Sequence, residues 1–557
     1  MAARVSPRPV PGTRKAMTRK ARRRGIAQLA AVPTGWGFSG FAVALLAALS
    51  LATPLHAKPF ACPRTGGEFV FALEANFQTL DQMASPALAT RDIAMNIHET
   101  LIARDENNQP ILELAERLIE SPDQLSYRFV LRQAVKFHNG KTMSSADVAA
   151  SFARYAKMGD RGGIMANIAG WDTPGADSFV IRLKAPQPTF IERLSWFSEP
   201  IVIVPEESRD VPAGELTHPI GTGPFQIVEA TPGEHVRLKR HDGYKPNASR
   251  ETRTGFAGFK QACLDSVDFR IVTGPVARAE GLRDGSFHGV EDLPAKFLAE
   301  LSRDPNVAIL PLRNWSIQLA SPNLSAPPTD NLFFRRAVQA VLDMDEIMEA
   351  ATGGQYSLNA GFQYPNQATY AEAGKEAYNI KDPALAARLL AQSGYGGEPV
   401  ILLTNKDYPP MYNAALAMQQ QLQAAGIIAQ LKVVDWPTSV RMARDGEASW
   451  NFFFTGWGTQ PALGPLATMR FFAGPNPSYH PPGGIQDPEL LAAWSGMNSL
   501  PDPRERQAAF ARMQAIVLEK VYAIPFGAFT KSQGIRANVK GFIPFRIPRM
   551  SNVWFAR

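Results

Sequence analysis

The chain has 557 residues, of which 45% are apolar and 20% are charged, and its formal net charge is +7. Residues 1–57 contain nine Lys or Arg and no Asp or Glu, so removing nine positive charges from +7 leaves −2 for residues 58–557. A near-neutral remainder gives no support for a nucleic acid partner or for attraction to an anionic membrane surface. About 500 residues of this composition can build two or three packed lobes.

The first segment is typical of a secretory leader. Its basic residues precede an apolar run at 41–52, which is 12 residues long, whereas a bilayer span needs about 20. Residues 55–57 read Leu-His-Ala and approximate a small-x-small cleavage site. We therefore expect cleavage after Ala57 and a periplasmic mature chain. The alternatives are an uncleaved anchor and a true start at Met17.

The two cysteines of the chain are Cys62 and Cys263. Each lies just before a run with strand character, at 68–73 and at 266–272. In an oxidising compartment this placement predicts a disulfide that joins neighbouring strands, with two buried free thiols as the alternative. Lipidation of Cys62 is disfavoured because residues 59–61 make a poor lipidation signal.

Residues 135–148 read VKFHNGKTMSSADV. The pattern predicts a strand, a tight turn at Asn139 and Gly140, and a helix that begins after Ser144 with Asp147 three residues further on. This is the first of several strand and helix units along the chain.

Further helices follow the same periodic rules. Residues 330–350 carry apolar side chains at helical spacing and predict one helix. Asp382 as N-cap, Pro383 at the first helical position and Gly394 as the stop predict another. A helix over 416–426 and a strand over 427–434 then complete an α/β pattern. The Pro-rich stretches at 321–328 and 474–488 are expected to be loops, the second being long enough to form a lip over a cleft.

The segment at 135–148 resembles the signature of the family 5 extracellular solute-binding proteins, the dipeptide, oligopeptide and nickel group. Segments at 220–225, 334–343 and 382–395 resemble the same family in the same order, as do Gly456 and Trp457. The resemblance covers nearly all of the chain after the leader. It implies a soluble, non-enzymatic subunit of an ABC importer with no cofactor, which captures a peptide or peptide-like solute and delivers it to permease subunits in the inner membrane.

The resemblance also implies an α/β fold, a two-lobed periplasmic-binding-protein clamp with an additional small domain. Lobe I is expected at 58–103, 219–310 and 525–557, the additional domain at 104–218, and lobe II at 311–524. Two hinge strands near 307–319 and 521–526 would connect the lobes. Such a clamp closes because a ligand that contacts both lobes favours the closed population. The family also implies a monomer.

Residues 451–460 predict a buried strand that ends in a Gly-flanked aromatic turn, an arrangement that can present a backbone edge and an indole face to a solute. In peptide-binding relatives the Trp that matches Trp457 packs on ligand side chains, and an Asp three residues later pairs with the peptide ammonium group. Here Gly456 and Trp457 are kept, but Gln460 occupies the acidic position. A free-amine dipeptide therefore needs an acid from elsewhere, for which Glu74 and Asp81 are candidates, with helix-capping or solvated residues as the favoured alternative.

Trp315 and Arg313 are further candidates for the site, because they lie in a proposed hinge. Trp315 would form a pocket wall, with a buried packing role as the alternative, and Arg313 would meet a ligand carboxylate through its planar fork, with a surface ion pair as the alternative. Tyr408 and Tyr412 are weaker candidates for the cleft.

Other classes of function find less support in the sequence. There is no G-x-S-x-G, H-E-x-x-H, P-loop or paired-Cys zinc motif, so a secreted hydrolase is the less favoured alternative. His235 and His241 are a weak metal pattern, and no metal site is expected. A non-peptide solute such as an opine, a glycoside or a nickel chelate remains the alternative ligand.

Overall fold

The computed structural model describes residues 58–557 except 86, 108, 159–162, 366, 368, 446–447, 459–463 and 474–484. The predicted leader and its cleavage site lie outside the described residues, as does most of the predicted loop at 474–488. Residues 57–557 form one compact unit. In the described part of the chain, no helix is long and apolar enough to cross a membrane.

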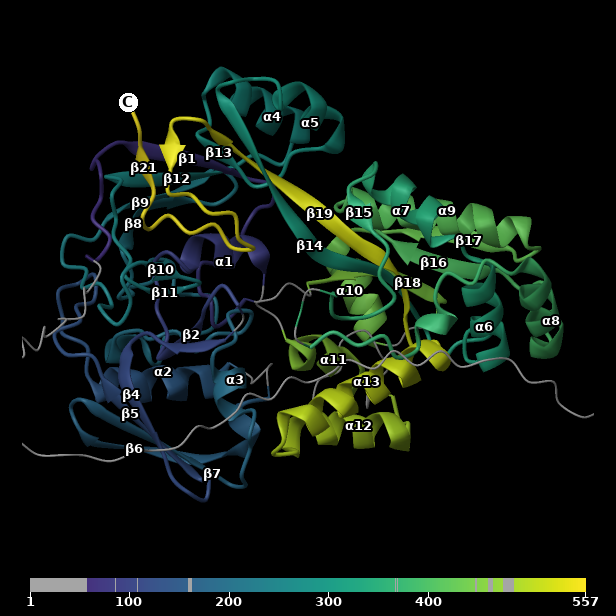
Figure 1. The fold of residues 1–557 in the computed structure, drawn as a ribbon, viewed down its shortest axis with the longest axis horizontal. Helices are drawn as coiled ribbons and strands as arrows, with labels where there is room; N and C mark the ends of the chain where they lie inside the picture. The colour runs from purple at the N-terminus through teal and green to yellow at the C-terminus, as the bar shows by residue number, and fades with distance from the viewer. Residues whose placement is uncertain are drawn as a thin grey trace, which may run out of the picture. The chain divides into compact units, whose positions relative to one another are not determined.

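One large mixed sheet organises the described chain. Its order is β17 (Ala429–Val433), β16 (Val400–Thr404), β18 (Phe452–Trp457), β14 (Val307–Pro322), β19 (Ile524–Arg536), β13 (Gly289–Val290), β1 (Glu68–Leu73), β12 (Ser266–Ile271), β9 (His235–Arg240) and β8 (Phe225–Thr231), with β15 (Tyr356–Ser357) paired to β19. Figure 1 shows β14 and β19 as two long strands side by side. They pair antiparallel from Val307 with Arg536 to Ala320 with Ile524.

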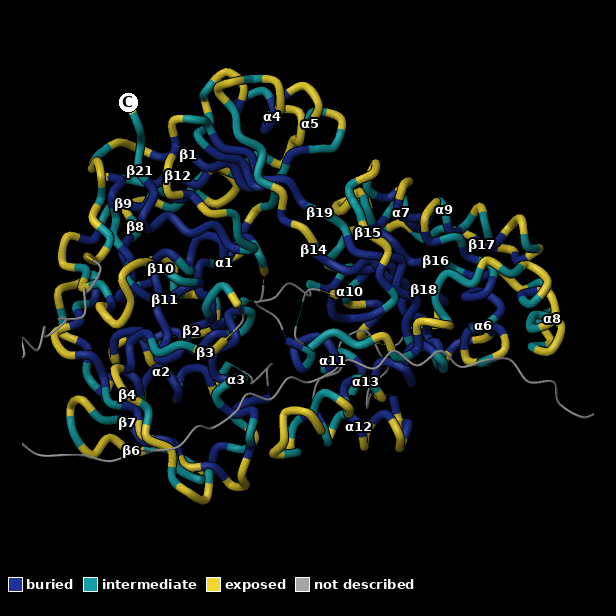
Figure 2. The backbone as a smooth tube through the Cα atoms, in the orientation of Figure 1, coloured by how far each residue is buried: buried dark blue, intermediate teal, exposed yellow. Residues whose placement is uncertain are grey.

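The two ends of this sheet are built around separate apolar cores. β16 pairs parallel with β17 and β18, and β1 pairs parallel with β12 and β13, which requires helical or long crossovers between them. One core joins β16 and β18 to helices on the sheet face, and another joins β1, β9 and β12. Figure 2 shows the strands largely buried, with outer helical surface exposed.

Thirteen α-helices lie in the described part of the chain. They are α1 (Leu88–Ala94), α2 (Ser145–Lys157), α3 (Phe190–Leu194), α4 (Pro275–Asp284), α5 (Ala295–Leu301), α6 (Leu332–Val341), α7 (Met344–Thr352), α8 (Pro383–Ser393), α9 (Pro409–Ala424), α10 (Trp436–Asp445), α11 (Pro465–Ala473), α12 (Pro488–Ser499) and α13 (Pro503–Glu519). The prediction of α8 is confirmed: the Asp382 carboxylate accepts from the Leu385 N–H, and Gly394 ends the helix at φ 72°.

The prediction of one helix over 330–350 is wrong. The chain leaves the helical conformation at Leu342, and Asp343 begins α7 as an N-cap that accepts from the N–H groups of Asp345 and Glu346. A capping carboxylate competes with helix continuation. The loop predicted over 321–328 begins two residues later in the structure, because β14 extends to Pro322.

A second sheet lies within residues 115–183. It has the order β4 (Ala115–Glu120), β5 (Ser126–Leu131), β7 (Ser178–Leu183) and β6 (Ile168–Gly175), and α2 packs against β6 and β7 over its own apolar core. The capping box that opens α2 is confirmed at Ser144 and Asp147. The predicted strand before it is wrong: only an isolated bridge between Lys136 and Thr142 forms there.

Three short ribbons complete the described strands. They are β2 (Ile102–Arg104) with β3 (Pro110–Leu112), β10 (Arg253–Thr254) with β11 (Ala257–Gly258), and β20 (Val539–Lys540) with β21 (Trp554–Phe555). The first two contain buried Arg side chains, Arg104 in β2 and Arg253 in β10.

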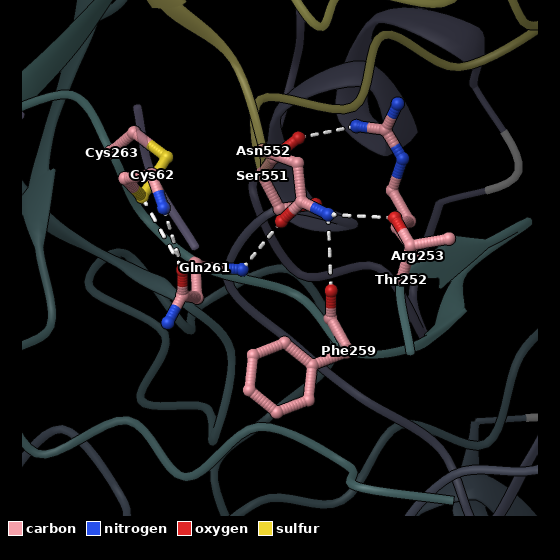
Figure 3. Close-up of a disulfide and its surroundings, with 8 residues drawn as sticks. All are labelled: Cys62, Thr252, Arg253, Phe259, Gln261, Cys263, Ser551 and Asn552. Atoms are coloured by element: carbon pink, nitrogen blue, oxygen red, sulfur yellow. Dashed lines mark hydrogen bonds between the residues drawn. A yellow bond between two sulfur atoms is a disulfide. The ribbon is translucent and has the colours of Figure 1, made fainter. Parts of the chain in front are cut away.

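Cys62 and Cys263 form a disulfide with a Cα–Cα distance of 5.5 Å (Figure 3). Cys62 lies before β1 and Cys263 before β12, and these two strands are neighbours. Beside the disulfide, Asn552 accepts from the Gln261 N–H at 2.7 Å and donates to the carbonyl of Phe259 at 3.0 Å (Figure 3). The start of the described chain is thereby attached to its C-terminal segment.

The segments at 135–148 and 220–225, distant in sequence, pack directly on each other. His138 Nδ1 accepts from the Gly221 N–H at 3.2 Å, so its Nε2 carries the proton and donates to the Gly223 carbonyl at 3.1 Å. A Cβ at Gly221 or Gly223 would lie 2.1 or 2.6 Å from the Ile97 carbonyl oxygen, which only glycine avoids. His241 Nδ1 lies 3.2 Å from the same Gly223 carbonyl.

Burial of histidines near this junction predicts destabilisation in acid. Burial lowers the pKa of His98 to about 4, although the charge of Asp81 opposes the shift and that of Arg154 adds to it. Because the unfolded chain binds the proton near pH 6.5, stability is lost as the pH falls from about 6.5 towards 4. His98→Gln should remove about 3 kcal/mol of that loss, measured as the difference between urea unfolding curves at pH 7 and 4.

The exposed His218 provides the matched control. His218→Gln should leave the pH dependence of the wild-type protein in place. An unchanged slope in His98→Gln would contradict the expected role of the buried ring.

Candidate ligand-binding site

The strand end that carries Gly456 and Trp457 is packed on both sides. The Trp457 side chain is 2% exposed and stacks on Phe471 of α11, with ring centroids 4.6 Å apart. Gly456 pairs with Gln318 of β14, and a Cβ there would lie 2.6 Å from the Gln318 Nε2. The turn that follows, with Gln460, lies outside the described residues.

Trp315 lies between two cations. The Lys531 Nζ is 4.5 Å from the centre of its ring and the Arg546 guanidinium is 4.4 Å from it. Arg546 also donates from Nη1 to the Trp315 carbonyl at 2.7 Å, and its guanidinium packs over Gly458, where a Cβ would lie 2.5 Å away. Cation–π contacts of this kind hold both the indole and the guanidinium in fixed orientations.

Glu74 belongs to a buried ionic network. Lys531 donates to Glu74 at 2.6 Å and to Glu291 at 2.7 Å, and Glu291 also accepts from the Glu74 N–H at 3.0 Å. Burial alone would lower the pKa of Lys531, but the charges of Glu291 and Glu74 raise it above its ordinary value. Burial and the charge of Glu74 raise the pKa of Asp292 to about 6.

Tyr408 follows β16, and its ring centre lies 5.4 Å from that of Trp436. It precedes α9, and burial together with the charge of Glu74 raises the pKa of its phenol to about 12. Tyr412 contacts Lys406 instead, at 5.2 Å from the ring centre.

Two neighbouring residues of α1 add buried charges. Asp92 is 0% exposed and Arg91 is 8% exposed. Among the described residues, neither side chain takes part in a hydrogen bond or an ion pair. Burial lowers the pKa of Arg91, and burial followed by the charge of Glu291 raises the pKa of Asp92 well above its usual value. Arg91 rests on the Phe197 ring, 6.0 Å from its centre.

α11 contributes an ion pair whose two charges act on Arg91. Arg470 Nη1 lies 2.6 Å from the carboxylate of Glu199, and its guanidinium is 5.7 Å from the centre of Trp196. The next residue, Phe471, carries the stack on Trp457. A segment near residue 199 and the strand end at Trp457 are therefore connected through two consecutive side chains of one helix.

The structure brings Glu74, Trp315 and the Gly456–Trp457 strand end into one neighbourhood. Arg313 is exposed and forms no ion pair within the described chain. Asp81, the other candidate acid, is engaged in a buried pair with Arg154 at 2.6 Å. It is therefore occupied as a structural partner, and its use as a ligand acid would leave Arg154 without one.

Sequence reasoning missed Arg91, Asp92, Glu291, Lys531 and Arg546. A single charged residue carries no local signal of burial, since charged side chains are mostly exposed. In the described ranges no group of three or more His, Cys, Asp or Glu side chains is placed to hold a metal ion.

The comparisons agree with this architecture. The family of bacterial extracellular solute-binding proteins, family 5 Middle, matches residues 109–479, which is more than half of the chain. The chain therefore belongs to this family, and its fold is the mixed α/β, two-lobed clamp of periplasmic binding proteins. The fold and the family match thus define the protein's class as a solute-binding protein.

Two curated proteins and one solved structure are similar to this chain over most of its length. A probable peptide ABC transporter periplasmic-binding protein of Sinorhizobium fredii is 26% identical over 86% of this chain and 92% of its own length. The glutathione-binding protein of Salmonella typhi is 25% identical over 89% of this chain and 95% of its own length. A similar solved structure is that of an ABC transporter-associated periplasmic binding protein from Helicobacter pylori, in complex with the peptide STSA. Its TM-score is 0.76 at 21% identity, and the match covers 89% of this chain and 99% of the other.

Proposed function

We propose that this chain captures peptides or peptide-like solutes in the periplasm and delivers them to the permease of an ABC importer. The observation that carries the proposal is the convergence of Glu74, Lys531 and Trp315, which come from the segment after β1 and from the two long strands β19 and β14. Family membership supports it, as do relatives that are named for peptides and for glutathione. The chain acts as a monomer and by binding alone, without catalysis.

In this proposal β14 and β19 are the hinge. Lobe I comprises 58–103, 219–310 and 525–557, lobe II comprises 311–524, and 104–218 form the additional domain. A solute that touches Glu74 of one lobe and Tyr408 or Trp457 of the other stabilises the closed form. Gly456, Arg313 and Gln460 complete the proposed site from the strand end, the hinge and the turn.

The leader belongs to the same proposal. Residues 1–57 direct export and are removed after Ala57, which makes Cys62 the fifth residue of the mature chain. The intact mass of protein from a periplasmic fraction tests this step, and a mass that includes residues 1–57 would overturn it.

Capture is tested with residues 58–557, glutathione and the tetrapeptide Ser-Thr-Ser-Ala. We expect at least one of them to change tryptophan fluorescence, because Trp315 and Trp457 lie at the site, and to lower the radius of gyration in X-ray scattering. We also expect the solute to be recovered intact. Hydrolysis products in the mixture, or a particle that no peptide of a broad panel compacts, would refute peptide capture.

A further inference from the structure

The ion pair between Glu199 and Arg470 joins two parts of the chain that the proposed domain organisation separates. Glu199 lies within 104–218, the proposed additional domain, and Arg470 belongs to α11 within 311–524, the proposed lobe II. Arg470 donates from Nη1 to Glu199 Oε1 at 2.6 Å, and the two side chains are 19% and 9% exposed. The contact between these two parts is thus made by largely buried charges.

The carboxylate of Glu199 depends on this one cation. In the described part of the chain, Arg470 is the only Lys, Arg or His within ion-pair distance of Glu199. The second carboxylate oxygen, Oε2, is buried without a hydrogen-bond partner among the described residues. A buried carboxylate that loses its cation remains desolvated but no longer has the compensating attraction. The pair therefore opposes any movement that separates α11 from residue 199.

Two further contacts cross the same boundary. The Arg470 guanidinium lies 5.7 Å from the centre of the Trp196 ring, a cation–π contact. Thr189, the residue before α3, donates from Oγ1 to the carbonyl of Asn498 in α12 at 3.3 Å. Trp196 also belongs to the buried apolar cluster that contains Phe472 of α11. The segment 189–199 therefore contacts lobe II through ionic, polar and aromatic groups.

α11 connects this boundary to the candidate site. Phe471 follows Arg470 directly, and the centre of its ring lies 5.1 Å from the Arg470 guanidinium. The same ring stacks on Trp457 at the end of β18, with centroids 4.6 Å apart. Packed side chains on a rigid helix can carry energetic coupling from one place to another. A shift of Arg470 relative to Glu199 therefore also displaces the ring that supports the indole.

We propose that Glu199 and Arg470 are positioning residues for solute capture, whose ion pair attaches the additional domain to α11 and favours the binding-competent arrangement of the lobes. The inference rests on the proposed function and assigns the additional domain a part in it. The pair acts through Phe471 and Trp457 rather than on the solute itself. It changes the fraction of molecules that are competent to bind, and the apparent Kd is the intrinsic Kd divided by that fraction. Loss of the pair should therefore weaken the binding of every solute by the same factor.

The binding test uses Glu199→Gln and Arg470→Gln in residues 58–557, titrated calorimetrically with glutathione and with Ser-Thr-Ser-Ala. We expect each variant to bind at least about 5-fold more weakly, the lower end of coupling between distant sites. The factor should be the same for every probe that binds the wild-type protein, whereas a residue that touches the solute would change the ratio between probes. Unchanged affinity, or a changed ratio, would overturn the positioning role.

The double variant tests whether the two residues act as a pair. It removes both charges and leaves neither of them buried and unpaired. It should therefore bind no more weakly than either single variant, and it also serves the comparison if a single variant does not fold. Losses that add in the double variant would show that the two residues act independently, and would overturn the pair.

A second measurement needs no solute. X-ray scattering of the ligand-free protein should give a larger radius of gyration for the single and double variants than for the wild-type protein, because the contact between the additional domain and α11 is weakened. An unchanged radius in all of them would overturn the proposal. If neither probe binds the wild-type protein, capture of these peptides fails, and the ligand-free scattering still decides the role of the pair.

Two exposed ion pairs in the same parts of the chain supply matched controls. Glu207 in the additional domain pairs with Lys141 at 2.9 Å, and Arg512 in α13 pairs with Glu489 at 3.1 Å. The Glu207 and Arg512 side chains are 55% and 49% exposed, and exposed pairs contribute little. Glu207→Gln and Arg512→Gln should bind and scatter like the wild-type protein. Equal losses in these controls would show that any change of charge weakens binding, and would overturn the role of the buried pair.

Discussion

Lys531→Met lowers the free energy of unfolding by about 3–5 kcal/mol, because it leaves the buried carboxylate of Glu291 without its cation and removes the nearer of the two cations beside Glu74. Lys531 contacts Glu74 at 2.6 Å and Glu291 at 2.7 Å, and its side chain is 3% exposed. Its pKa lies above the ordinary value, so the lysine is charged throughout the range in which the protein can be studied. Urea unfolding at pH 7 measures the loss.

The double variant Lys531→Met with Glu291→Gln tests the electrostatic origin of this loss. Removing one of the orphaned carboxylates should restore part of the stability, whereas loss of packing alone would not be restored. Lys157→Met is the matched control, since Lys157 pairs with Asp210 at 2.5 Å but both side chains are 62% exposed. Such a pair contributes at most about 1 kcal/mol. A similar cost in both single variants would contradict the role of burial.

Trp457→Ala lowers the free energy of unfolding by about 3–5 kcal/mol, since it opens a large cavity in an aromatic core. The indole is 2% exposed and packs against Phe471, Phe472 and Phe362. The variant should also weaken peptide binding by at least about 1 kcal/mol, the lower scale of an aromatic anchor. Urea unfolding measures the first effect, and calorimetric titration with glutathione or Ser-Thr-Ser-Ala, whichever binds the wild-type protein, measures the second.

Two variants keep these effects apart. Trp457→Phe fills most of the cavity, so it should recover most of the stability and reveal how much binding depends on the indole. Phe333→Ala removes an aromatic side chain that is 44% exposed and should cost under about 1 kcal/mol. Unchanged affinity in Trp457→Ala would leave the residue with a packing role alone.

The parts of the fold that the sequence predicts are those decided by neighbouring residues. Asp382, Pro383 and Gly394 fix both ends of α8 within a dozen positions, and the structure has the helix there. The break between α6 and α7 follows from a local signal too, since Asp343 is a strong capping residue. The apolar spacing continues through Leu342 and by itself predicts a single helix. Periodicity does not detect one capping residue within the pattern.

The candidate site depends on contacts that no local pattern encodes. Lys531 and Glu74 are separated by 457 positions in sequence and meet only because β19 and β1 both border β13. Arg91 and Asp92 are an ordinary charged pair in the sequence, and their burial is decided by the packing of α1. Aromatic residues such as Trp315 were easier to find, because a large ring near a strand end is buried in most proteins.

The irregular pairing of β14 with β19 has a mechanical consequence. The register of the two strands shifts between Leu312 and Ser316 and again between Gln318 and Leu319, and Trp315 lies in the first of these stretches. Extra residues in a ladder increase local twist and let a strand change direction. The indole that Lys531 and Arg546 contact thus lies in an irregular stretch of the long ribbon, where the strands can change direction. Trp315 thus takes part both in the proposed binding site and in the irregular stretch of β14. A substitution of Trp315 would alter the binding of the solute and the local twist of the ribbon together.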